Sequence, residues 1–311
     1  MKNSVLCLLG PTACGKSALA LKLAKEFPCE IINVDAAQIY RGCDIGTAKP
    51  TQEERTLVPH HLLDICEVTE SYSAARFVAD ATSAINDILV RGKVPLLVGG
   101  TMLYFKALEE GLTTLPKKDP KIREQIFEEA KNYGWEYLHT ELTKIDPESA
   151  AKIHPHDSQR IERAHEVYRL TGEPMSKLHL NHAPLLSPYT FYNLVLWPKN
   201  RDQLKTRISQ RFFAMLQAGF VQEVDNFYHT QKYNCETPAF RMVGYREIWQ
   251  YLSGKMSFQQ LCELVPLATW HLAKRQLTWL KKWPQGAQVI SADDGYFAQT
   301  LNLIKNLLNS Q

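Results

Sequence analysis

The sequence lacks the features that mark several specialised classes of protein. It contains no run of roughly 18–20 apolar residues, so no membrane span is expected. Its seven cysteines are scattered without a CxxC pair, which argues against a zinc site and against a disulfide framework. No internal repeat or low-complexity tract is visible. These absences favour a globular protein of a reduced, cytoplasmic compartment.

An excess of charge of one sign is also lacking. The 311 residues include 36 Lys+Arg and 33 Asp+Glu, for a net charge of +3. This balance neither requires nor excludes a nucleic-acid partner, because a small basic face can lie within a balanced total. The length suggests one large domain with an insertion, or two domains, since a domain spans roughly 150 residues.

The strongest positive signal is a glycine-rich loop close to the N-terminus. The apolar run of residues 5–9 has the composition of a buried strand, and we expect a strand here instead of a secretion signal. A helix up to Phe27 is predicted after the loop. The loop itself matches the pattern GxxxxGK[ST] at every fixed position, with Gly10, Pro11, Thr12, Ala13, Cys14, Gly15, Lys16 and Ser17.

This order of strand, loop and helix predicts a site for a di- or triphosphate. Glycines let consecutive backbone N–H groups converge on an anion at a helix N-terminus. Lys16 adds a positive charge, and the hydroxyl of Ser17 can bind a magnesium ion. The complete pattern disfavours a loop that only joins a strand to a helix.

A carboxylate follows the second predicted strand, over residues 30–34. Asp35 is expected beside the phosphate-binding loop, because ligands of open α/β sheets bind beyond the carboxyl ends of the strands. It could bind magnesium or accept a proton from a nucleophile, and capping a helix is an equally compatible role. Asp64 is a weaker candidate for a magnesium-binding acid, since the stretch before it is short. The pair His60-His61 lacks metal-ligand spacing and is expected to be structural or solvent-facing.

The remaining pattern predicts a P-loop-type parallel α/β sheet flanked by helices. A helix over residues 73–91 precedes a strand over 94–98 and the turn Gly99-Gly100-Thr101, and a further strand is expected at 189–196. Helical periodicity dominates between them, including a helix from Ser158 that Asp157 caps. The expected organisation is a first part of the catalytic core at 1–112, a mostly helical insertion at 113–188, and a second part of the core with C-terminal helices at 189–311.

Two basic segments follow the insertion. Arg207 and Arg211 are four residues apart on a predicted helix that Asn200 caps. Either a solvated basic face or an arginine directed at the phosphates fits this spacing. Residues 274–283 contain four cations, two tryptophans and no acid. Such a segment suits a phosphodiester backbone and unstacked bases, and a solvated helix end explains it about equally well.

Taken together, these motifs resemble those of the tRNA dimethylallyltransferase family. Two positions depart from the family pattern. Cys14 stands where the family usually has a small residue such as Ser or Ala, and Ala36 stands where Ser is common. Neither change removes a catalytic group. The matching segments keep the family's order from the first strand to about Trp283, and they are residues 10–17, 35–50 (DAAQIYRGCDIGTAKP), 72–77 (YSAARF), 99–104 (GGTMLY), 157–164 (DSQRIERA) and 243–246 (VGYR).

The resemblance implies a prenyl-transfer reaction on tRNA. The dimethylallyl group of dimethylallyl diphosphate would pass to N6 of the adenosine immediately 3′ of the anticodon, giving N6-dimethylallyladenosine and diphosphate. That base would be flipped out of its stack, and no nucleotide would be hydrolysed. The resemblance makes Asp35 the general base and gives the diphosphate and Mg²⁺ to Lys16, Thr12, Ser17 and Arg211, with Ser17 as the metal ligand. Whether ATP also binds the loop is left open.

The resemblance also implies where tRNA is contacted. The helical insertion is expected to grip the anticodon stem-loop, and a monomer with no membrane partner is expected. The contact positions carried over from the family are Asp35, Ala36, Ala37 and Gln38, then Thr101 and Arg123, then Gln159, Arg160, Ile161, Glu162 and Arg163, and finally Phe240, Arg241, Met242, Val243, Gly244 and Tyr245.

Two other functions fit parts of the pattern. A kinase of a small metabolite would share the loop, the acid and a helical lid, but no second magnesium acid and no arginine-rich lid are found. A non-catalytic RNA-binding module would not need an intact Lys16, Ser17 and Asp35. Both alternatives are therefore disfavoured.

Overall fold

The computed structural model describes residues 3–113, 115–180, 187–283, 286–292 and 296–309. The chain divides into two compact units. The first unit combines Met1–Glu109 with Ser187–Gln311, and the second is Glu110–Leu186. Within the described residues, no helix has both the length and the apolar character that a membrane crossing requires.

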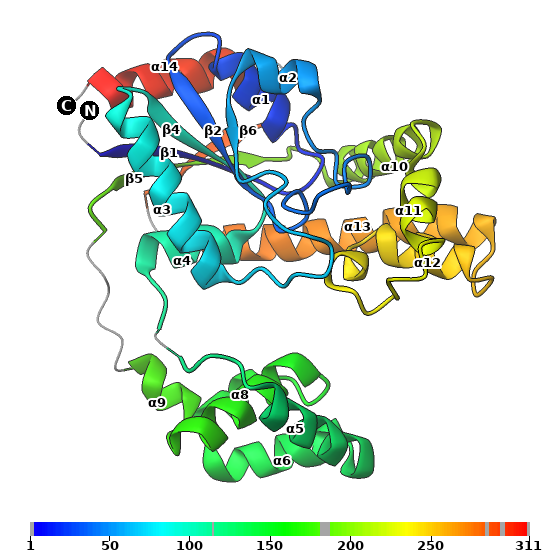
Figure 1. The fold of residues 1–311 in the computed structure, drawn as a ribbon. Coiled ribbons are helices and arrows are strands. Elements are labelled where there is room, and N and C mark those ends of the chain that lie inside the picture. The colour runs from blue at the N-terminus through cyan, green and yellow to red at the C-terminus, as the bar shows by residue number, and fades with distance from the viewer. Residues whose placement is uncertain (1–2, 114, 181–186, 284–285, 293–295, 310–311) are drawn as a thin grey trace. The chain divides into compact units, whose positions relative to one another are not determined.

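A parallel sheet forms the centre of the first unit (Figure 1). Its strand order is β3-β2-β4-β1-β5-β6, and every pairing is parallel. All residues of β1, β2 and β4 are buried, which explains why these strands are mostly apolar without alternation, with buried polar exceptions that include Glu30 and Asn33 of β2. The predicted fold class is confirmed. The strands are β1 (Ser4–Leu9), β2 (Cys29–Val34), β3 (His60–His61), β4 (Val94–Gly99), β5 (Thr190–Trp197) and β6 (Gln288–Ser291).

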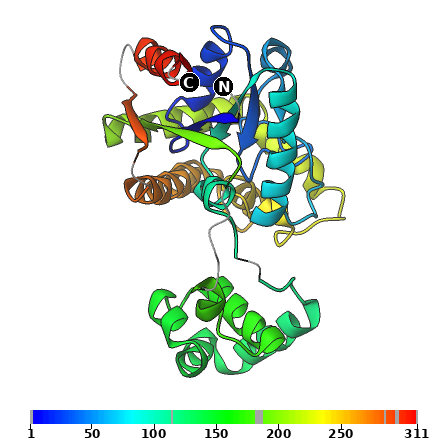
Figure 2. The ribbon, with the colours of Figure 1, turned by 90° about the vertical axis from the view of Figure 1, so that its left-hand side faces the viewer.

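Helices cover both faces of this sheet (Figure 2). Leu6 and Leu8 of β1 face a core that includes α1 and α14, whereas Val5, Cys7 and Leu9 face a core that includes α3 and α4. Alternate residues of one strand therefore hold a layer on each side. The helices are α1 (Lys16–Leu23), α3 (Ala74–Val90), α4 (Met102–Glu110) and α14 (Tyr296–Asn309), and the short α2 (Gln52–Leu57) precedes β3.

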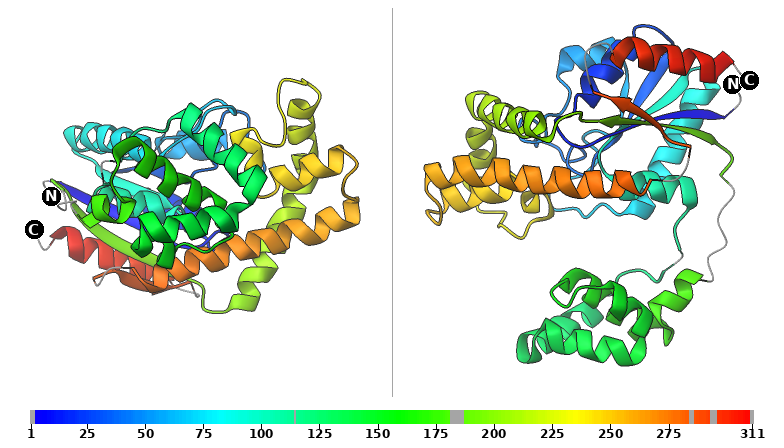
Figure 3. Two further views of the ribbon diagram at one scale, coloured as in Figure 1. Left: turned by 90° about the horizontal axis from the view of Figure 1, so that it is seen from below. Right: turned by 180° about the vertical axis from the view of Figure 1, so that it is seen from behind.

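The C-terminal part of the first unit adds a group of helices beside the sheet. The long α13 packs against α10 and α12, as both views of Figure 3 show. Pro266 lies inside α13, and Ser257 opens it with a capping box. Asn200 caps α10 as predicted. The elements are α10 (Arg201–Gln217), α11 (Phe220–Tyr228), the 3-10 helix η1 (Pro238–Arg241), α12 (Tyr245–Leu252) and α13 (Phe258–Lys281).

The second unit is helical and has a core of its own. Ile126, Leu138, Leu142 and Ile161 are fully or almost fully buried in it. Asp157 caps α8 as predicted, by accepting a hydrogen bond from the backbone N–H of the residue three positions on. The helices are α5 (Pro120–Tyr133), α6 (Trp135–Ile145), α7 (Pro147–Lys152), α8 (Ser158–Thr171) and α9 (Met175–Leu180).

The structure corrects three details of the sequence interpretation. Helix α1 ends at Leu23 and does not reach Phe27, because the chain then passes into turns in which the N–H groups of Lys25 and Glu26 bond to carbonyls three residues back. The edge strands β3 and β6 were not predicted. Trp283, one of the two tryptophans in the basic segment 274–283, is not an exposed aromatic that an unstacked base could reach. It packs edge-on against Phe105 at the margin of the core.

Candidate active site

The glycine-rich loop joins β1 to α1 at the carboxyl end of the sheet. Ala13 (φ 62°) and Gly15 (φ 98°) both adopt left-handed backbone conformations, which curl the loop before α1 begins. Gly10 has no room for a side chain, because a Cβ there would lie 2.7 Å from the Cys14 sulfur and 2.9 Å from the Leu196 carbonyl oxygen. The loop therefore has the curled backbone before a helix N-terminus that an anion site requires.

Four cations line the cavity beside this loop, and two of them, Lys49 and Arg55, pair with Asp64. The Lys16 ammonium donates to the Pro11 carbonyl at 2.7 Å. The Arg211 guanidinium donates to Thr12 Oγ1 at 3.2 Å and to the Thr47 carbonyl at 3.4 Å. Neither Lys16 nor Arg211 has a carboxylate within ion-pair distance in the described part of the chain. Two positive charges therefore lack a counter-ion here.

Arg211 is partly buried, and this burial affects the pKa of its side chain. It lowers the pKa of the Arg211 guanidinium below its usual value, and the neighbouring Asp35 carboxylate acts in the opposite direction. An arginine still keeps its proton at any physiological pH. The cost of burying this charge makes a bound anion favourable, because a paired buried charge is far less costly than an unpaired one. Of the two interpretations that the sequence left open, Arg211 fits the arginine directed at the phosphates, whereas Arg207 is solvent-exposed.

Asp35 follows β2 directly and lies at the edge of the same cavity. Its Oδ1 accepts a hydrogen bond from the Ala37 N–H at 2.9 Å, and the Ala36 N–H donates to Thr101 Oγ1 at 3.0 Å. No helix begins between residues 36 and 51, all of which are described, so the helix-cap interpretation of Asp35 is wrong. Through its hydrogen bond with the Ala36 N–H, Thr101 holds the backbone next to the Asp35 carboxylate.

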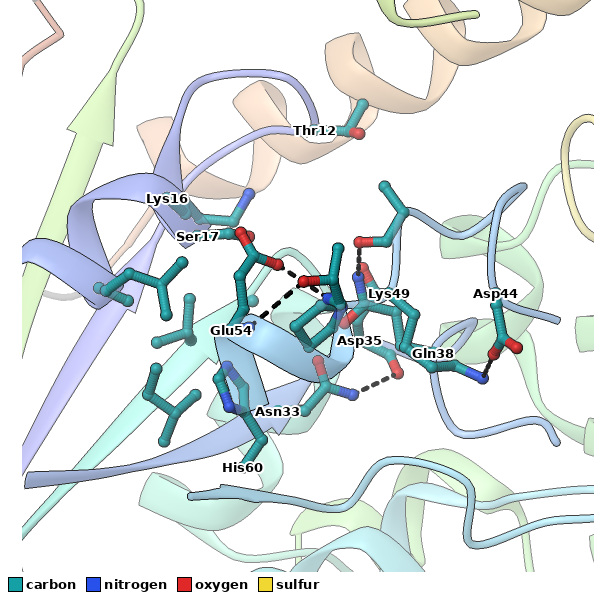
Figure 4. A pocket seen from close by; sticks show the side chains of 18 of the residues that line it. Thr12, Lys16, Ser17, Asn33, Asp35, Gln38, Asp44, Lys49, Glu54 and His60 are labelled. Atoms are coloured by element: carbon teal, nitrogen blue, oxygen red, sulfur yellow. Dashed lines mark hydrogen bonds and ion pairs between the residues drawn. The ribbon is translucent and has the colours of Figure 1, made fainter. Parts of the chain in front are cut away.

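Two cavities meet at this point. The first, of about 890 Å³, contains Lys16 and Ser17 on its P-loop side and Asp35 and Gln38 on another (Figure 4). The second, of about 530 Å³, is mainly apolar and includes Trp279. The residues that line both are Thr12, Ala13, Asp35, Gly100, Arg211, Met215 and Gln276. One cavity suits an anion and the other a flat apolar group, with Asp35 between them.

Gln276 of α13 is a site residue that the sequence interpretation missed. Its Oε1 accepts from the Thr12 N–H at 2.8 Å, and its Nε2 donates to the Gly100 carbonyl at 2.9 Å. A signal for it exists in the sequence, because Gln276 stands among the buried positions Ala273, Leu277 and Leu280 of one helix. A polar residue in a buried stripe needs specific partners.

The loop between β2 and α2 closes another side of the first cavity. Glu223 accepts hydrogen bonds from the backbone N–H groups of residues 44, 45 and 46, at 2.9, 2.7 and 3.1 Å. Gln38 donates to the carbonyls of residues 47 and 48, both at 3.1 Å. These contacts fix the loop whose carbonyl at Thr47 faces Arg211.

Asp64 and the two histidines have structural roles. Asp64 pairs with the buried Lys49 at 2.7 Å and with Arg55 at 2.8 Å. Burial alone would raise the pKa of Asp64, but the hydrogen bonds from Lys49 and Arg55 outweigh it and lower the pKa. His60 bonds to the Val58 carbonyl and His61 to Glu30, as expected of structural histidines.

Apart from Gln38, which lines the first cavity, the expected RNA-contact positions of the first unit fall into two groups. Arg241, Met242, Val243 and Gly244 line the second cavity, together with Ala36, Ala37 and Thr101. Phe240 and Tyr245 have 0% exposure and pack on each other and on Phe220 and Trp249. These two side chains therefore support the segment and are not available for direct contact.

The expected contact positions of the second unit form their own cluster. Arg123 donates to the fully buried Glu166 at 3.0 Å and pairs with Glu162 at 2.9 Å, and Arg163 also pairs with Glu166. Ile161 is fully buried, so direct contact is not possible for it either. Gln159 and Arg160 are solvent-exposed.

The donor set at the P-loop fits a magnesium ion. Mg²⁺ is usually bound by one or two protein oxygens together with substrate phosphates and water, without a dedicated protein cage. Among the described residues, no group of three or more His, Cys, Asp or Glu side chains could hold a metal ion. Ser17 lines the first cavity, and its hydroxyl supplies a protein oxygen of the required kind.

Comparison with known proteins supplies independent information. A family model described as IPP transferase matches residues 38–283. The tRNA dimethylallyltransferase of Coxiella burnetii (strain Dugway 5J108-111) is 47% identical over 303 residues, which are 97% of each chain. That of Thioalkalivibrio sulfidiphilus (strain HL-EbGR7) is 50% identical over 293 residues, covering 94% of this chain and 91% of the relative. A crystal structure of a eukaryotic dimethylallyltransferase acting on tRNA has a TM-score of 0.85 at 28% identity, covering 99% of this chain and 80% of the other.

Proposed function

Since this chain belongs to the IPP transferase family, whose curated relatives are tRNA dimethylallyltransferases, we propose that it transfers a dimethylallyl group from dimethylallyl diphosphate to tRNA. The acceptor is N6 of the adenosine immediately 3′ of the anticodon. The products are N6-dimethylallyladenosine and diphosphate.

One observation carries the proposal, namely that the cavity beside the P-loop, which holds Lys16 and Arg211 without an ion-pair partner in the described chain, shares a wall with a mainly apolar cavity. That wall contains Asp35 and Arg211. A prenyl diphosphate in the first cavity can direct its reactive carbon toward the second. An adenine that has left its stack in the RNA loop fits the second cavity, where Trp279 offers an aromatic surface. Extruding a base from a single-stranded loop costs only a few kcal/mol.

Asp35 takes the proton that the reaction releases. The adenine N6 amine is a weak nucleophile, so it must be positioned and must lose a proton as the new bond forms. The nitrogen forms a bond to the allylic carbon, the carbon–oxygen bond to the diphosphate breaks, and the proton passes to Asp35. The hydrogen bonds at Ala36 and Ala37 hold the backbone around this carboxylate during the step.

The P-loop side stabilises the leaving group. Negative charge gathers on the diphosphate as the carbon–oxygen bond breaks, and Lys16 and Arg211 line the cavity in which this charge would lie. Thr12 holds Arg211 through its hydroxyl. A magnesium ion bound by Ser17 and by diphosphate oxygens would neutralise part of the same charge.

The proposed setting is the cytoplasm, where tRNA is modified by a monomer. All seven cysteines lie in the described residues and carry free thiols, in keeping with a reducing compartment. The exposed Gln159 and Arg160 of the second unit are proposed to contact the anticodon stem-loop. Arg123 of α5 holds their helix through Glu166, and Arg163 holds it by donating to the Pro116 carbonyl.

A prenyl-transfer assay tests the proposal. Purified protein is given Mg²⁺, labelled dimethylallyl diphosphate and an unmodified anticodon stem-loop with adenosine 3′ of the anticodon. We expect label in the RNA and none in a matched stem-loop that has guanosine at that position. Hydrolysis of ATP at enzyme-like rates with no label in either RNA would instead indicate a kinase and refute the proposal.

A further inference from the structure

We propose that Gln276 is a positioning residue. It holds the leaving-group side of the active site at a fixed separation from the proton-accepting side. The inference rests on the proposed function and adds a residue to it. Gln276 belongs to α13, far in sequence from both loops that it contacts, and its side chain is almost completely buried, with 9% exposure of the residue.

The two contacts determine how the amide is oriented. The Thr12 N–H can only donate, so it faces Oε1 at 2.8 Å. The Gly100 carbonyl can only accept, so it faces Nε2 at 2.9 Å. A glutamine supplies one acceptor and one donor at the distance that these two backbone groups require. The side chain thereby ties the P-loop to the turn after β4.

Each of the two loops leads to one half of the proposed chemistry. On one side, the Thr12 hydroxyl accepts from Arg211, which faces the leaving diphosphate. On the other side, Thr101 follows Gly100 and accepts from the Ala36 N–H next to the carboxylate of Asp35. A shift of either loop would therefore change the separation between the anion site and the base.

The space around Gln276 supports a specific role. A Cβ at Gly100 would lie 2.4 Å from Nε2 of Gln276, so the glycine is needed for the close approach of the amide. The same stretch of α13 contributes Leu272, Arg275 and Trp279 to the lining of the second cavity. Contacts made by an RNA base on this helix can thus affect the P-loop through Gln276.

Three variants test the role. Gln276→Met keeps the length of the side chain and removes both hydrogen bonds, whereas Gln276→Glu can restore them only when the carboxyl is protonated. A protonated glutamate donates to the Gly100 carbonyl and accepts from the Thr12 N–H, but an ionised one sets a negative oxygen against that carbonyl. Gln259→Met is the matched control, because Gln259 is an exposed residue of the same helix whose side chain donates, within the described part of the chain, only to Glu263 at 3.3 Å.

The readouts are the single-turnover rate of transfer to the stem-loop at about pH 6 and about pH 8.5, and the thermal midpoint. The affinities for inorganic diphosphate, by calorimetry, and for the stem-loop without prenyl donor are measured as well. We expect Gln276→Met to lose roughly 10- to 100-fold in rate, as a broken pair of buried hydrogen bonds implies, and RNA affinity to change less than about threefold. The rate of Gln276→Glu is expressed as a fraction of the rate of the unsubstituted protein at the same pH. This fraction should be larger at the lower of the two pH values than at the higher. Gln259→Met should match the unsubstituted protein.

Two results would overturn the inference. One is a Gln276→Met protein that transfers the prenyl group and binds diphosphate normally. The other is a Gln276→Glu defect that is the same fraction at both pH values, since a role for the two hydrogen bonds requires the defect to diminish when the carboxyl is protonated. Absence of transfer by the unsubstituted protein would refute the proposed function instead, and in that case diphosphate affinity, which needs no RNA, still decides whether Gln276 positions the P-loop.

Discussion

Replacing Asp35 by asparagine separates the role of its charge from its role in the fold. The Oδ1 acceptor for the Ala37 N–H remains in the asparagine, so the turn after β2 should survive. The substituted amide cannot take the proton of the adenine amine. General bases contribute about 10²–10⁴ in rate, so we expect kcat for prenyl transfer to fall by about that factor, or about 3–5 kcal/mol of transition-state stabilisation.

The assay compares two quantities on one protein preparation. Single-turnover transfer of labelled dimethylallyl group gives the rate, and binding of the stem-loop without prenyl donor gives the RNA affinity, which should stay within about threefold of the original. Asp87→Asn, at an exposed position of α3, is the matched control and should alter neither. Equal losses of rate and RNA affinity in Asp35→Asn would show that the carboxylate acts in binding and not as the base.

Three further predictions concern other parts of the chain. Arg211→Gln should weaken calorimetric binding of inorganic diphosphate by about tenfold or more with RNA affinity unchanged, because charged hydrogen bonds contribute about 1.5–3 kcal/mol; unaltered diphosphate binding would contradict it. Burial raises the pKa of Glu30, but hydrogen bonds from Arg91, His61 and Lys93 outweigh this and lower it to about 2. Because this pKa lies below the unfolded value of about 4.3, the stabilisation is complete above that pH and disappears as the pH falls toward 2. Urea titrations should show a loss of about 3 kcal/mol over that interval, which Glu30→Gln should remove; an identical acid profile for the variant would refute the assignment. Trp279→Ala should lower stem-loop affinity by about 1–3 kcal/mol while leaving diphosphate binding intact, and the reverse pattern would place the base elsewhere.

The central strands were predictable because burial on both faces gives an unmistakable pattern. Residues 5–9 are apolar throughout, since Leu6 and Leu8 face one helical layer and the residues between them face the other. Strand β6 offers no such signal. Only Ile290 of its four residues is buried, as is usual at the edge of a sheet, so its pattern cannot be distinguished from that of a loop.

The site was predictable where its function depends on neighbours in sequence. Gly10, Gly15 and Lys16 act through the curl of one short loop, and their spacing alone indicates an anion site. Asp35 could be placed at the edge of the sheet, but its spacing fitted a helix cap equally well. Only the absence of a helix in the described residues 36–51 excludes that role, because a capping aspartate would also accept from the backbone N–H two positions on.

The residues that connect the loops act across distances in sequence that no local pattern records. Arg211 bonds to Thr12 over 199 residues, and Gln276 bonds to Gly100 over 176. Their helices nevertheless carry a trace of these contacts, because each polar side chain lies beside the buried stripe of its helix, next to Phe212 in one case and Leu277 in the other. A buried polar group must find a partner, and around a parallel sheet the unsatisfied backbone groups gather in the loops at the carboxyl edge. The helical pattern therefore identifies a polar residue that needs a partner, whereas the segment that supplies the partner is visible only in the folded chain: the buried His165 of α8, for example, bonds to the Leu138 carbonyl within the second unit and not to a loop of the site.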